Sequence, residues 1–410
     1  MRDTFRFFRL EWRFLGFGLL LSFASSFGQT FYIALFSAEV RGAFDLSHGD
    51  FGAVYSAATL LSAAVLAWAG KGLDRIDLRL FVAVVLLGLA AASGVFALAP
   101  GVAGLGLALF LLRLFGQGLS PHIAFASMAR YYTAARGRAV GFVALGQPFG
   151  EAVFPALAVA AIALIGWRGA WGAGVALILF ALLPLALWLL KGHAIRHADW
   201  QAAHAAATAN GDGERDWSRA AVLRDPRFYL VLPVALAGAF IVTGFFFHQV
   251  HLFAVKGWSL ALLAAAFTGY AVATAATALL AGPVVDRLGA ARLLPAVLVP
   301  LVLSLGCVAA FEAPAAAVAY LVLAGVAMGL QNTVLTPLWA ELYGTAHIGA
   351  IRALFTSLSV LASAGSPVLF GLLIDGGVTL ESIALACMAY CLAAIALAWA
   401  AVRRPAAAPA

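Results

Sequence analysis

The feature that most constrains the fold is a series of apolar stretches, each about as long as a membrane-spanning helix. A helix needs about 20 largely apolar residues to cross the hydrocarbon core of a bilayer. Measured along the 410 residues, this length predicts twelve spanning segments. They cover residues 13–37, 49–70, 78–99, 102–129, 137–165, 168–190, 227–254, 259–281, 290–311, 314–342, 348–374 and 379–401. We therefore expect an all-α membrane protein with twelve transmembrane helices, since a helix satisfies its own backbone hydrogen bonds in lipid.

The composition excludes a soluble protein and a nucleic-acid-binding one. Hydrophobic residues make up 64% of the chain and charged residues 10%, whereas a soluble domain has about 25% charged residues. A chain with so few charges cannot cover a water-facing surface, so the lipid bilayer is its predicted partner. The formal net charge is +7, but the basic residues are dispersed among loops and form no nucleic-acid-binding face.

We expect no cleaved leader at the N-terminus. We also expect no disulfide, metal site or cofactor from the three cysteines. Four arginines precede an apolar run from Phe14 to beyond Phe36, which is too long for the 7–15-residue core of a secretory signal. The run is therefore interpreted as the first span. Cys307, Cys387 and Cys391 all lie in apolar segments, where they suit helix packing better than a disulfide framework or a metal site.

The distribution of Lys and Arg predicts the orientation. With the N-terminus inside, the inner loops and tails hold 21 of these residues, and the outer loops hold only Arg41, Arg168 and Lys256. Positive residues concentrate on the cytoplasmic side of membrane proteins. We therefore expect a multi-pass protein of the inner (plasma) membrane with both termini in the cytoplasm. The remaining basic residue, Arg113, lies in the middle of the fourth segment.

One long polar interval separates the first six segments from the last six. It runs from Lys191 to about Arg224 and contains three histidines, which we expect to be solvated: His193, His197 and His204. This interval predicts an N-terminal six-helix bundle over residues 1–190, a cytoplasmic linker over 191–225 and a C-terminal six-helix bundle over 226–410.

A short polar cassette occurs in both halves, 212 positions apart. The first copy reads GKGLDRIDLR from Gly70 to Arg79, and the second reads GPVVDRLGAAR from Gly282 to Arg292. Other pairs keep nearly the same register. Arg138 and Arg352 each open a span 214 positions apart, and Pro155 and Pro367 lie 212 positions apart. The two halves are therefore predicted to be structural repeats.

The cassette resembles the loop between helices 2 and 3 of major facilitator superfamily transporters, which has the pattern Gly-x-x-x-Asp-Arg-x-Gly-x-x-Arg. The resemblance implies two pseudo-symmetric six-helix bundles and a transporter that works by alternating access, not an enzyme. It also implies a conformational lock in which Asp74 meets the start of the eleventh span near Gly349, and Asp286 meets the start of the fifth near Arg138. The first copy departs from the pattern because Asp77 replaces a glycine. The lock residues are Gly70, Asp74, Arg75, Arg79, Gly282, Asp286, Arg287 and Arg292.

Arg113 and Glu151 are the predicted centre of the transport chemistry. A charge at the bilayer centre costs about 2.5–3.5 kcal/mol even on insertion scales, and both residues lie deep within their segments. A buried carboxylate favours its protonated form, whereas a neighbouring guanidinium favours the ionised form. We expect the two groups to alternate between pairing with each other and engaging substrate or a proton; a purely structural ion pair is the alternative.

Other polar residues lie on spans one, four, seven and ten, which line the central cavity in the resembled family. Those expected to bind substrate or protons are Gln29, Tyr32, Gln117, His248, Gln331 and Asn332. His248 lies near the outer end of its span, so a gating role and a simple interfacial position both remain open.

The substrate class rests on a weaker resemblance. The stretches FHQVHL at Phe247, LYGTAHIG at Leu342 and AGSP at Ala364 resemble the monocarboxylate and oxalate/formate exchanger branch. A single buried cation among neutral hydrogen-bonding groups suits a small organic anion, because a guanidinium can clamp a carboxylate. We expect a monomer that couples transport to protons or exchange. The alternative is a proton-coupled exporter of amphipathic drugs or metabolites, favoured by the aromatic run Phe245–Phe247.

Overall fold

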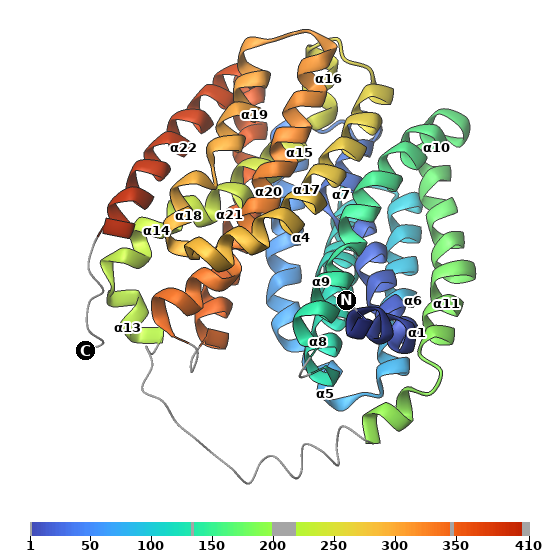
Figure 1. The fold of residues 1–410 in the computed structure, drawn as a ribbon. Coiled ribbons are helices and arrows are strands. Elements are labelled where there is room, and N and C mark those ends of the chain that lie inside the picture. Colours follow the sequence, from blue (N-terminus) through green and yellow to red (C-terminus); the bar gives the residue numbers. More distant parts are fainter. Residues whose placement is uncertain (1, 133–134, 199–218, 345–347, 404–410) are drawn as a thin grey trace. The chain divides into compact units, whose positions relative to one another are not determined.

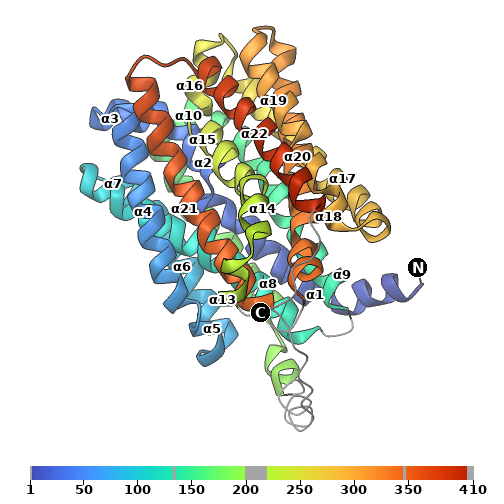
Figure 2. The ribbon, with the colours of Figure 1, turned by 90° about the vertical axis from the view of Figure 1, so that its left-hand side faces the viewer.

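The computed structural model describes residues 2–132, 135–198, 219–344 and 348–403. These residues form helices joined by short turns and contain no strand. They divide into two compact units. Unit 1 comprises residues 1–36 and 57–212, and unit 2 comprises residues 37–56 and 213–410. Figures 1 and 2 show the course of the chain within each unit.

Unit 1 begins with a helix, α1, that starts at Arg2, well before the first predicted span. The first span is broken after α1 and continues through short helical pieces. The helices of this unit are α1 (Arg2–Ala24), η1 (Ser25–Gly28), α2 (Thr30–Ile33), η2 (Ala34–Phe36), the later part of α4 (His48–Ala69), α5 (Gly72–Arg75), α6 (Leu78–Leu98), α7 (Val102–Leu111), η3 (Leu112–Leu119), α8 (Ser120–Tyr131), α9 (Arg136–Ala144), α10 (Gly146–Leu177), η4 (Ile178–Leu182) and α11 (Leu183–Leu189). Segments η3 and η4 are π-helical, and η1 and η2 are 3₁₀-helical.

Unit 2 contains longer uninterrupted helices, and it also includes the outer part of the first helical hairpin. Its helices are α3 (Ser37–Phe44), the start of α4, α13 (Arg219–Arg224), α14 (Pro226–Ala237), η5 (Gly238–Val242), α15 (Thr243–Phe247), α16 (Gln249–Val255), α17 (Leu260–Leu288), α18 (Ala290–Leu293), η6 (Leu294–Ala296), α19 (Val299–Ala310), α20 (Pro314–Tyr343), α21 (Ile348–Asp375) and α22 (Leu380–Arg403). Segment η5 is π-helical. In both views α20 lies between α17 and α19.

The helices match the predicted series of spans. Ten helical runs of the described chain are long and apolar enough to cross a membrane, and the bent pair Arg6–Gly28 and Thr30–Phe44 makes eleven. One run, Arg136–Leu189, has 54 residues and contains both the fifth and the sixth predicted segments. It turns at Gly166, whose φ of 70° lies in the left-handed region that glycine tolerates. The arrangement is consistent with twelve spans.

Small residues let the helices of each unit pack closely. In unit 1, a Cβ added to Gly146 would lie 2.7 Å from the Ser22 Cβ of α1. In unit 2, a Cβ on Gly329 of α20 would lie 2.7 Å from the Thr274 carbonyl oxygen of α17. Glycines spaced four apart commonly let membrane helices approach at their backbones. The pairs Gly146/Gly150 and Gly325/Gly329 therefore allow close helix contacts within each unit.

The start of the linker departs from the sequence prediction. His193 was expected in solvent, but it is 5% exposed and its ring stacks on Phe14 of α1, with the ring centroids 5.6 Å apart. Gly192, with a φ of 86°, turns the chain after α11 so that helical residues 193–198 lie against α1. His197 is half-buried, and His204 lies outside the described residues.

Candidate functional site

The first span is interrupted where it meets η3. Gln29, between η1 and α2, has an extended backbone with φ −81° and ψ 149°. At the break, the backbones of Gly28 and Gly116 touch. A Cβ on Gly28 would overlap the Leu112 carbonyl oxygen and would lie 2.8 Å from the Gly116 Cα. Two glycines therefore allow a contact between the first and fourth spans that no larger residue would permit.

This contact brings a buried backbone carbonyl to Arg113. The Arg113 side chain is 2% exposed, and its Nη1 donates a hydrogen bond to the Gly28 carbonyl oxygen over 3.1 Å. Segment η3, which carries Arg113, is π-helical, and π-bulges in membrane and soluble helices often mark functional sites. The predicted burial of this arginine is thus confirmed, and its position depends on the break in the first span.

Glu151 is buried on the neighbouring helix α10. It is 4% exposed, and its Oε1 accepts a hydrogen bond from the Gln147 Nε2 over 3.1 Å. The adjacent Gly150 packs against the Ser26 hydroxyl so closely that an added Cβ would overlap it. The carboxylate is therefore held near the broken part of the first span, and its pairing with Arg113 stays a prediction.

The other predicted residues of unit 1 have different surroundings. Gln117 is half-buried on η3. Tyr32 is 4% exposed and packs edge-on against Phe27, Phe154 and Trp171, with ring centroids 5.2–5.5 Å apart. In this structure Tyr32 is part of an aromatic core, and such edge-on pairs stabilise it beyond the area that they bury.

Unit 2 has a contact like the one between Arg113 and Gly28: a side chain of the tenth span donates to a backbone carbonyl of the seventh span. Gln331 is 6% exposed, and its Nε2 donates to the Ala235 carbonyl oxygen over 2.8 Å. A Cβ on Gly238, at the start of η5, would lie 2.9 Å from the Gln331 Cδ. Gln331 follows Gln117 by 214 positions, the register that relates Arg138 to Arg352. The donor in unit 1 is Arg113, four residues before Gln117, so the two units join corresponding spans through different positions of the repeat.

A cavity of about 300 Å³ lies beside Gln331; we call it the C-terminal cavity. Helices α14, η5, α20 and α21 line it with Ala235, Ala239, Met328, Gln331, Asn332, Leu335, Thr336, Trp339, Arg352, Phe355, Thr356 and Ser359. Two predicted binding residues, Gln331 and the exposed Asn332, thus share one cavity with an exposed arginine.

Two buried donors in the wall of this cavity have no hydrogen-bond partner among the described residues. They are the Trp339 Nε1 and the Ser359 Oγ. A buried polar group without a partner costs about 1–3 kcal/mol, so such groups indicate a place where a ligand can supply an acceptor. Together with the Arg352 guanidinium, they give the C-terminal cavity the donors that an anion requires.

The two cassettes form different turns. In unit 1, Asp77 caps α6 by accepting from the backbone N–H of Arg79 over 2.9 Å, so the departure from the glycine pattern serves as a helix cap. In unit 2, Gly289 has a φ of 83°, and Glu341 of α20 accepts from the Ala290 N–H over 2.7 Å.

The predicted lock residues lie around these turns. The side chain of Asp74 lies outside the described residues. Arg75, Arg79, Asp286, Arg287 and Arg292 are exposed, and Gly70 and Gly282 are half-buried. The expected contacts of Asp74 and Asp286 join the two halves, and the lock stays a prediction.

The comparisons with known proteins agree with this architecture. The family model described as Major Facilitator Superfamily matches residues 18–267. The chain belongs to the major facilitator superfamily. It is a membrane transporter and not an enzyme. No curated protein sequence matches the chain.

Solved structures confirm the fold of the transporter. It is similar to a bacterial homologue of the human lysosomal transporter Spinster in an inward-facing and occupied conformation, with a TM-score of 0.70 and 15% sequence identity over 96% of this chain and 98% of that one. The inward-facing and unoccupied structure of a bacterial Spinster homologue gives a TM-score of 0.63 at 15% identity, over 96% and 97% of the two chains. At this identity the likeness shows the fold alone.

His248 of the transporter lies in a cluster of imidazoles in unit 2. It is 2% exposed, and its Nε2 lies 3.0 Å from the Pro367 carbonyl oxygen. The His48 ring lies 5.6 Å from that of His248 and 4.2 Å from that of His251, between centroids. The cavity among them holds about 10 Å³, no more than one water. His248 therefore has no room for a substrate here, and a gating role remains the open prediction.

An acidic residue holds the same region together. Asp375, at the end of α21, accepts from the backbone N–H groups of His48 and Gly49 over 3.0 and 2.7 Å. It thereby caps the N-terminus of α4, where a negative charge is also favoured by the helix dipole. Within the described residues, no group of three or more His, Cys, Asp or Glu side chains is arranged to hold a metal ion.

Three residues that line the C-terminal cavity were not among the binding residues predicted from the sequence. The sequence identified Arg352 only as a charge that opens the eleventh span in register with Arg138, and it gave no prediction for Trp339 or Ser359. The signal that pointed to Arg352 was its register with Arg138, because a basic residue at the start of both the fifth and eleventh spans lies close to the end of the preceding span. Only the structure shows that the Trp339 Nε1 and the Ser359 Oγ have no hydrogen-bond partner among the residues that it describes.

Proposed function

We propose that the protein is a secondary active transporter of a small organic anion of the monocarboxylate type, bound in the C-terminal cavity. The observation that carries this proposal is the combination of Arg352 with the unpartnered Trp339 Nε1 and Ser359 Oγ around about 300 Å³. A guanidinium can bind a carboxylate through two parallel hydrogen bonds. A carboxylate oxygen would also give the indole N–H and the hydroxyl the acceptor that they lack.

The neutral groups of the cavity suit the rest of a small polar solute. Asn332 is exposed to it, and Thr336 and Thr356 add hydroxyls. The volume is at the lower limit for small-molecule sites, which commonly enclose about 300–1,000 Å³. This size favours a carboxylate of a few carbon atoms over a larger substrate.

We further propose that transport is coupled to protons through Glu151. Glu151 is buried, and among the described residues it accepts a hydrogen bond from the neutral Gln147. Carboxyl groups buried in membrane spans commonly belong to proton relays. In this proposal the monomeric transporter lies in the plasma membrane with both termini in the cytoplasm. The cation that binds substrate is Arg352, and Arg113 acts with Glu151.

The first experiment measures thermal stabilisation of the purified transporter by small carboxylates and by cationic dyes. We expect carboxylates to stabilise the wild-type protein and to lose this effect in Arg352→Gln. Trp339→Phe removes the N–H and keeps an aromatic ring. It should weaken binding by about tenfold or more, as expected for one hydrogen bond to a charged group. Arg403→Gln removes an exposed arginine that does not line the cavity, so it serves as the matched control.

Carboxylates that stabilise the protein are then tested for uptake into proteoliposomes with and without a pH gradient. Equal stabilisation of the wild-type protein and Arg352→Gln would contradict the binding site. Stabilisation by cationic dyes alone would contradict the substrate class.

A second cavity of unit 2 favours the alternative function. It holds about 440 Å³ and is lined mainly by apolar residues of α14, η5, α21 and α22, among them Phe240, Leu369 and Phe370. Such a cavity suits an amphipathic compound, so export of drugs or amphipathic metabolites is the second candidate. Stabilisation by dyes that is lost in Phe240→Ala and kept in Arg352→Gln would favour it.

A further inference from the structure

A separate basic cavity lies in unit 1, where α1 enters its span and α11 leaves its own. It holds about 210 Å³. The residues that line it are Leu10, Glu11, Arg13, Phe14, Leu189, Leu190, Lys191, Gly192, His193 and Arg196. Four of these side chains can donate to an anion: Arg13, Lys191, His193 and Arg196. We call this the α1–α11 cavity.

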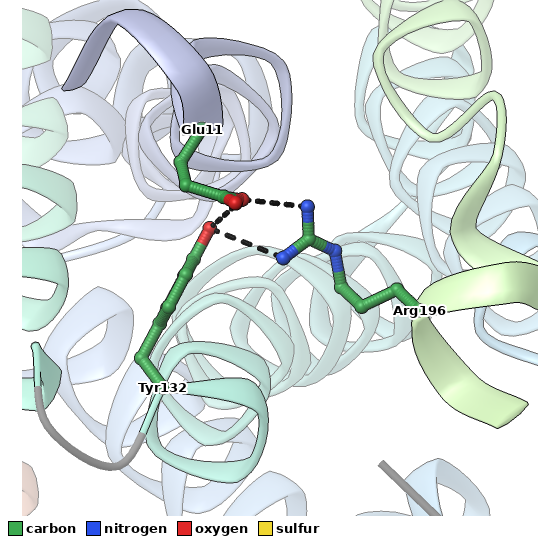
Figure 3. Close-up of polar contacts among 3 residues, drawn as sticks. All are labelled: Glu11, Tyr132 and Arg196. Carbon is green, nitrogen blue, oxygen red and sulfur yellow. Dashed lines mark hydrogen bonds and ion pairs between the residues drawn. The ribbon is translucent and has the colours of Figure 1, made fainter. Parts of the chain in front are cut away.

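One acidic residue of this cavity is already neutralised. Glu11 forms an ion pair with Arg196 at 2.6 Å and accepts a hydrogen bond of 2.7 Å from the Tyr132 hydroxyl. Figure 3 shows the three side chains meeting from α1, the end of α8 and the start of the linker. Arg196 also lies over the Phe14 ring at 4.5 Å. The positive charges of Arg13 and Lys191 therefore remain in excess in the cavity.

Two buried nitrogen atoms of the cavity lack a hydrogen-bond partner within the described part of the chain. They are the Arg13 Nε and the His193 Nδ1. The Arg13 Nη2 already donates to the Trp188 carbonyl oxygen, so the guanidinium is fixed with its Nε unused. His193 is 95% buried, since 5% is exposed. An oxygen anion bound beside them would give each nitrogen the acceptor that it lacks.

The surface beside the cavity is apolar and aromatic. Trp12 and Trp188 contact each other with ring centroids 5.6 Å apart, yet they remain 51% and 43% exposed, and Leu10 is 63% exposed. Tryptophan is enriched at the level of lipid head groups. The last residue of the neighbouring spanning run is Leu189, which places the cavity at the depth of those head groups.

We propose that the α1–α11 cavity binds the phosphate group of an anionic phospholipid. Arg13, Lys191 and His193 hold the phosphate oxygens, and Trp12, Trp188 and Leu10 lie against the acyl chains. Basic pockets between membrane helices bind acidic lipid head groups in this way. The site is independent of the C-terminal cavity, and it would tie the N-terminal helix and the start of the linker to the membrane.

The test measures lipid binding to the full-length protein by native mass spectrometry, with phosphatidylglycerol and phosphatidylcholine as probes. We expect the wild-type protein to prefer phosphatidylglycerol. Lys191→Gln changes an exposed side chain and should fold normally, and it should reduce this preference about threefold. Arg13→Gln should reduce it about tenfold, as expected for a lost charged hydrogen bond. Arg9→Gln makes the same charge change at an exposed site of α1 outside the cavity and should leave the preference intact.

Two outcomes would overturn the proposal. One is an equal loss of preference in Arg9→Gln and Lys191→Gln, which would mean that only the total charge matters. The other concerns the source of the phosphate. The proposal is wrong if inorganic phosphate displaces phosphatidylglycerol from the protein, or if it stabilises the protein against heat as much as phosphatidylglycerol does. Either result would mean that the site recognises a free anion and not a lipid.

Discussion

Replacing Gly28 by alanine tests the contact on which the position of Arg113 depends. An added Cβ would lie 2.5 Å from the Gln117 backbone nitrogen and 2.8 Å from the Gly116 Cα, and it would overlap the Leu112 carbonyl oxygen. All three atoms belong to the backbone of η3, so no side-chain rotation can relieve the overlap. The first and fourth spans must therefore move apart.

The loss of stability expected for Gly28→Ala has two parts. Overpacking a tight site costs about 1–3 kcal/mol, and the rigid backbone neighbours place this case at the upper end. Separation of the spans also draws the Gly28 carbonyl away from the Arg113 Nη1, now 3.1 Å away. A hydrogen bond from a charged group contributes about 1.5–3 kcal/mol. We expect Gly28→Ala to lower the free energy of unfolding by roughly 4–6 kcal/mol.

The assay is equilibrium unfolding in mixed micelles, followed by tryptophan fluorescence. Gly172→Ala is the matched control because Gly172 is exposed and an added Cβ would meet nothing within 4 Å. This control should gain about 0.5–1 kcal/mol from the lower backbone entropy of the unfolded chain. A double-mutant cycle with Arg113→Gln should show coupling, since both changes remove the same hydrogen bond. Equal stability of Gly28→Ala and Gly172→Ala would refute the reasoning.

Three further predictions concern proton coupling, the α4 cap and pH. Glu151→Gln should express normally but lose pH-driven transport in proteoliposomes; unchanged transport would rule out Glu151 as the proton carrier. Asp375→Ala should destabilise the start of α4 by about 1 kcal/mol, because it removes a helix cap. In a cysteine-free background that carries Ser56→Cys, this change should make thiol labelling at position 56 about fivefold faster. An unchanged labelling rate would contradict the capping role. Burial lowers the pKa of His193 to about 4, so the folded state binds fewer protons than the unfolded state. Stability should fall by on the order of 2 kcal/mol as pH drops from about 6.5 towards 4, and calorimetry should show this fall reduced in His193→Gln.

The spans could be predicted from the sequence because lipid imposes one simple requirement on every helix that crosses it. Each apolar run had to be long enough to span the bilayer and to pair its own backbone groups. The breaks inside the spans could not be predicted in the same way. The extended residue Gln29, the left-handed Gly166 and the π-helical η3 are local departures that depend on contacts with other helices.

The burial of Arg113 and Glu151 could be predicted, but the surroundings of the site residues could not. Hydropathy places a residue at a depth in the membrane without showing which helix it faces. Tyr32 and Gln331 were both polar residues at suitable depths, yet one lies in an aromatic core and the other lines a cavity. A binding role for Arg352 was not predicted, because the concentration of basic residues at cytoplasmic helix ends already explained its position.

The two units also indicate why the charge of Arg113 calls for a functional explanation. In each unit a side chain of the fourth or tenth span donates to a carbonyl of the first or seventh span: Arg113 to Gly28, and Gln331 to Ala235. Unit 2 shows that a neutral amide is sufficient for this bond. An arginine at the bilayer centre costs about 2.5–3.5 kcal/mol on insertion scales. Because a neutral side chain is enough to join the helices, we expect the charge on Arg113 to serve transport, in the role proposed above together with Glu151.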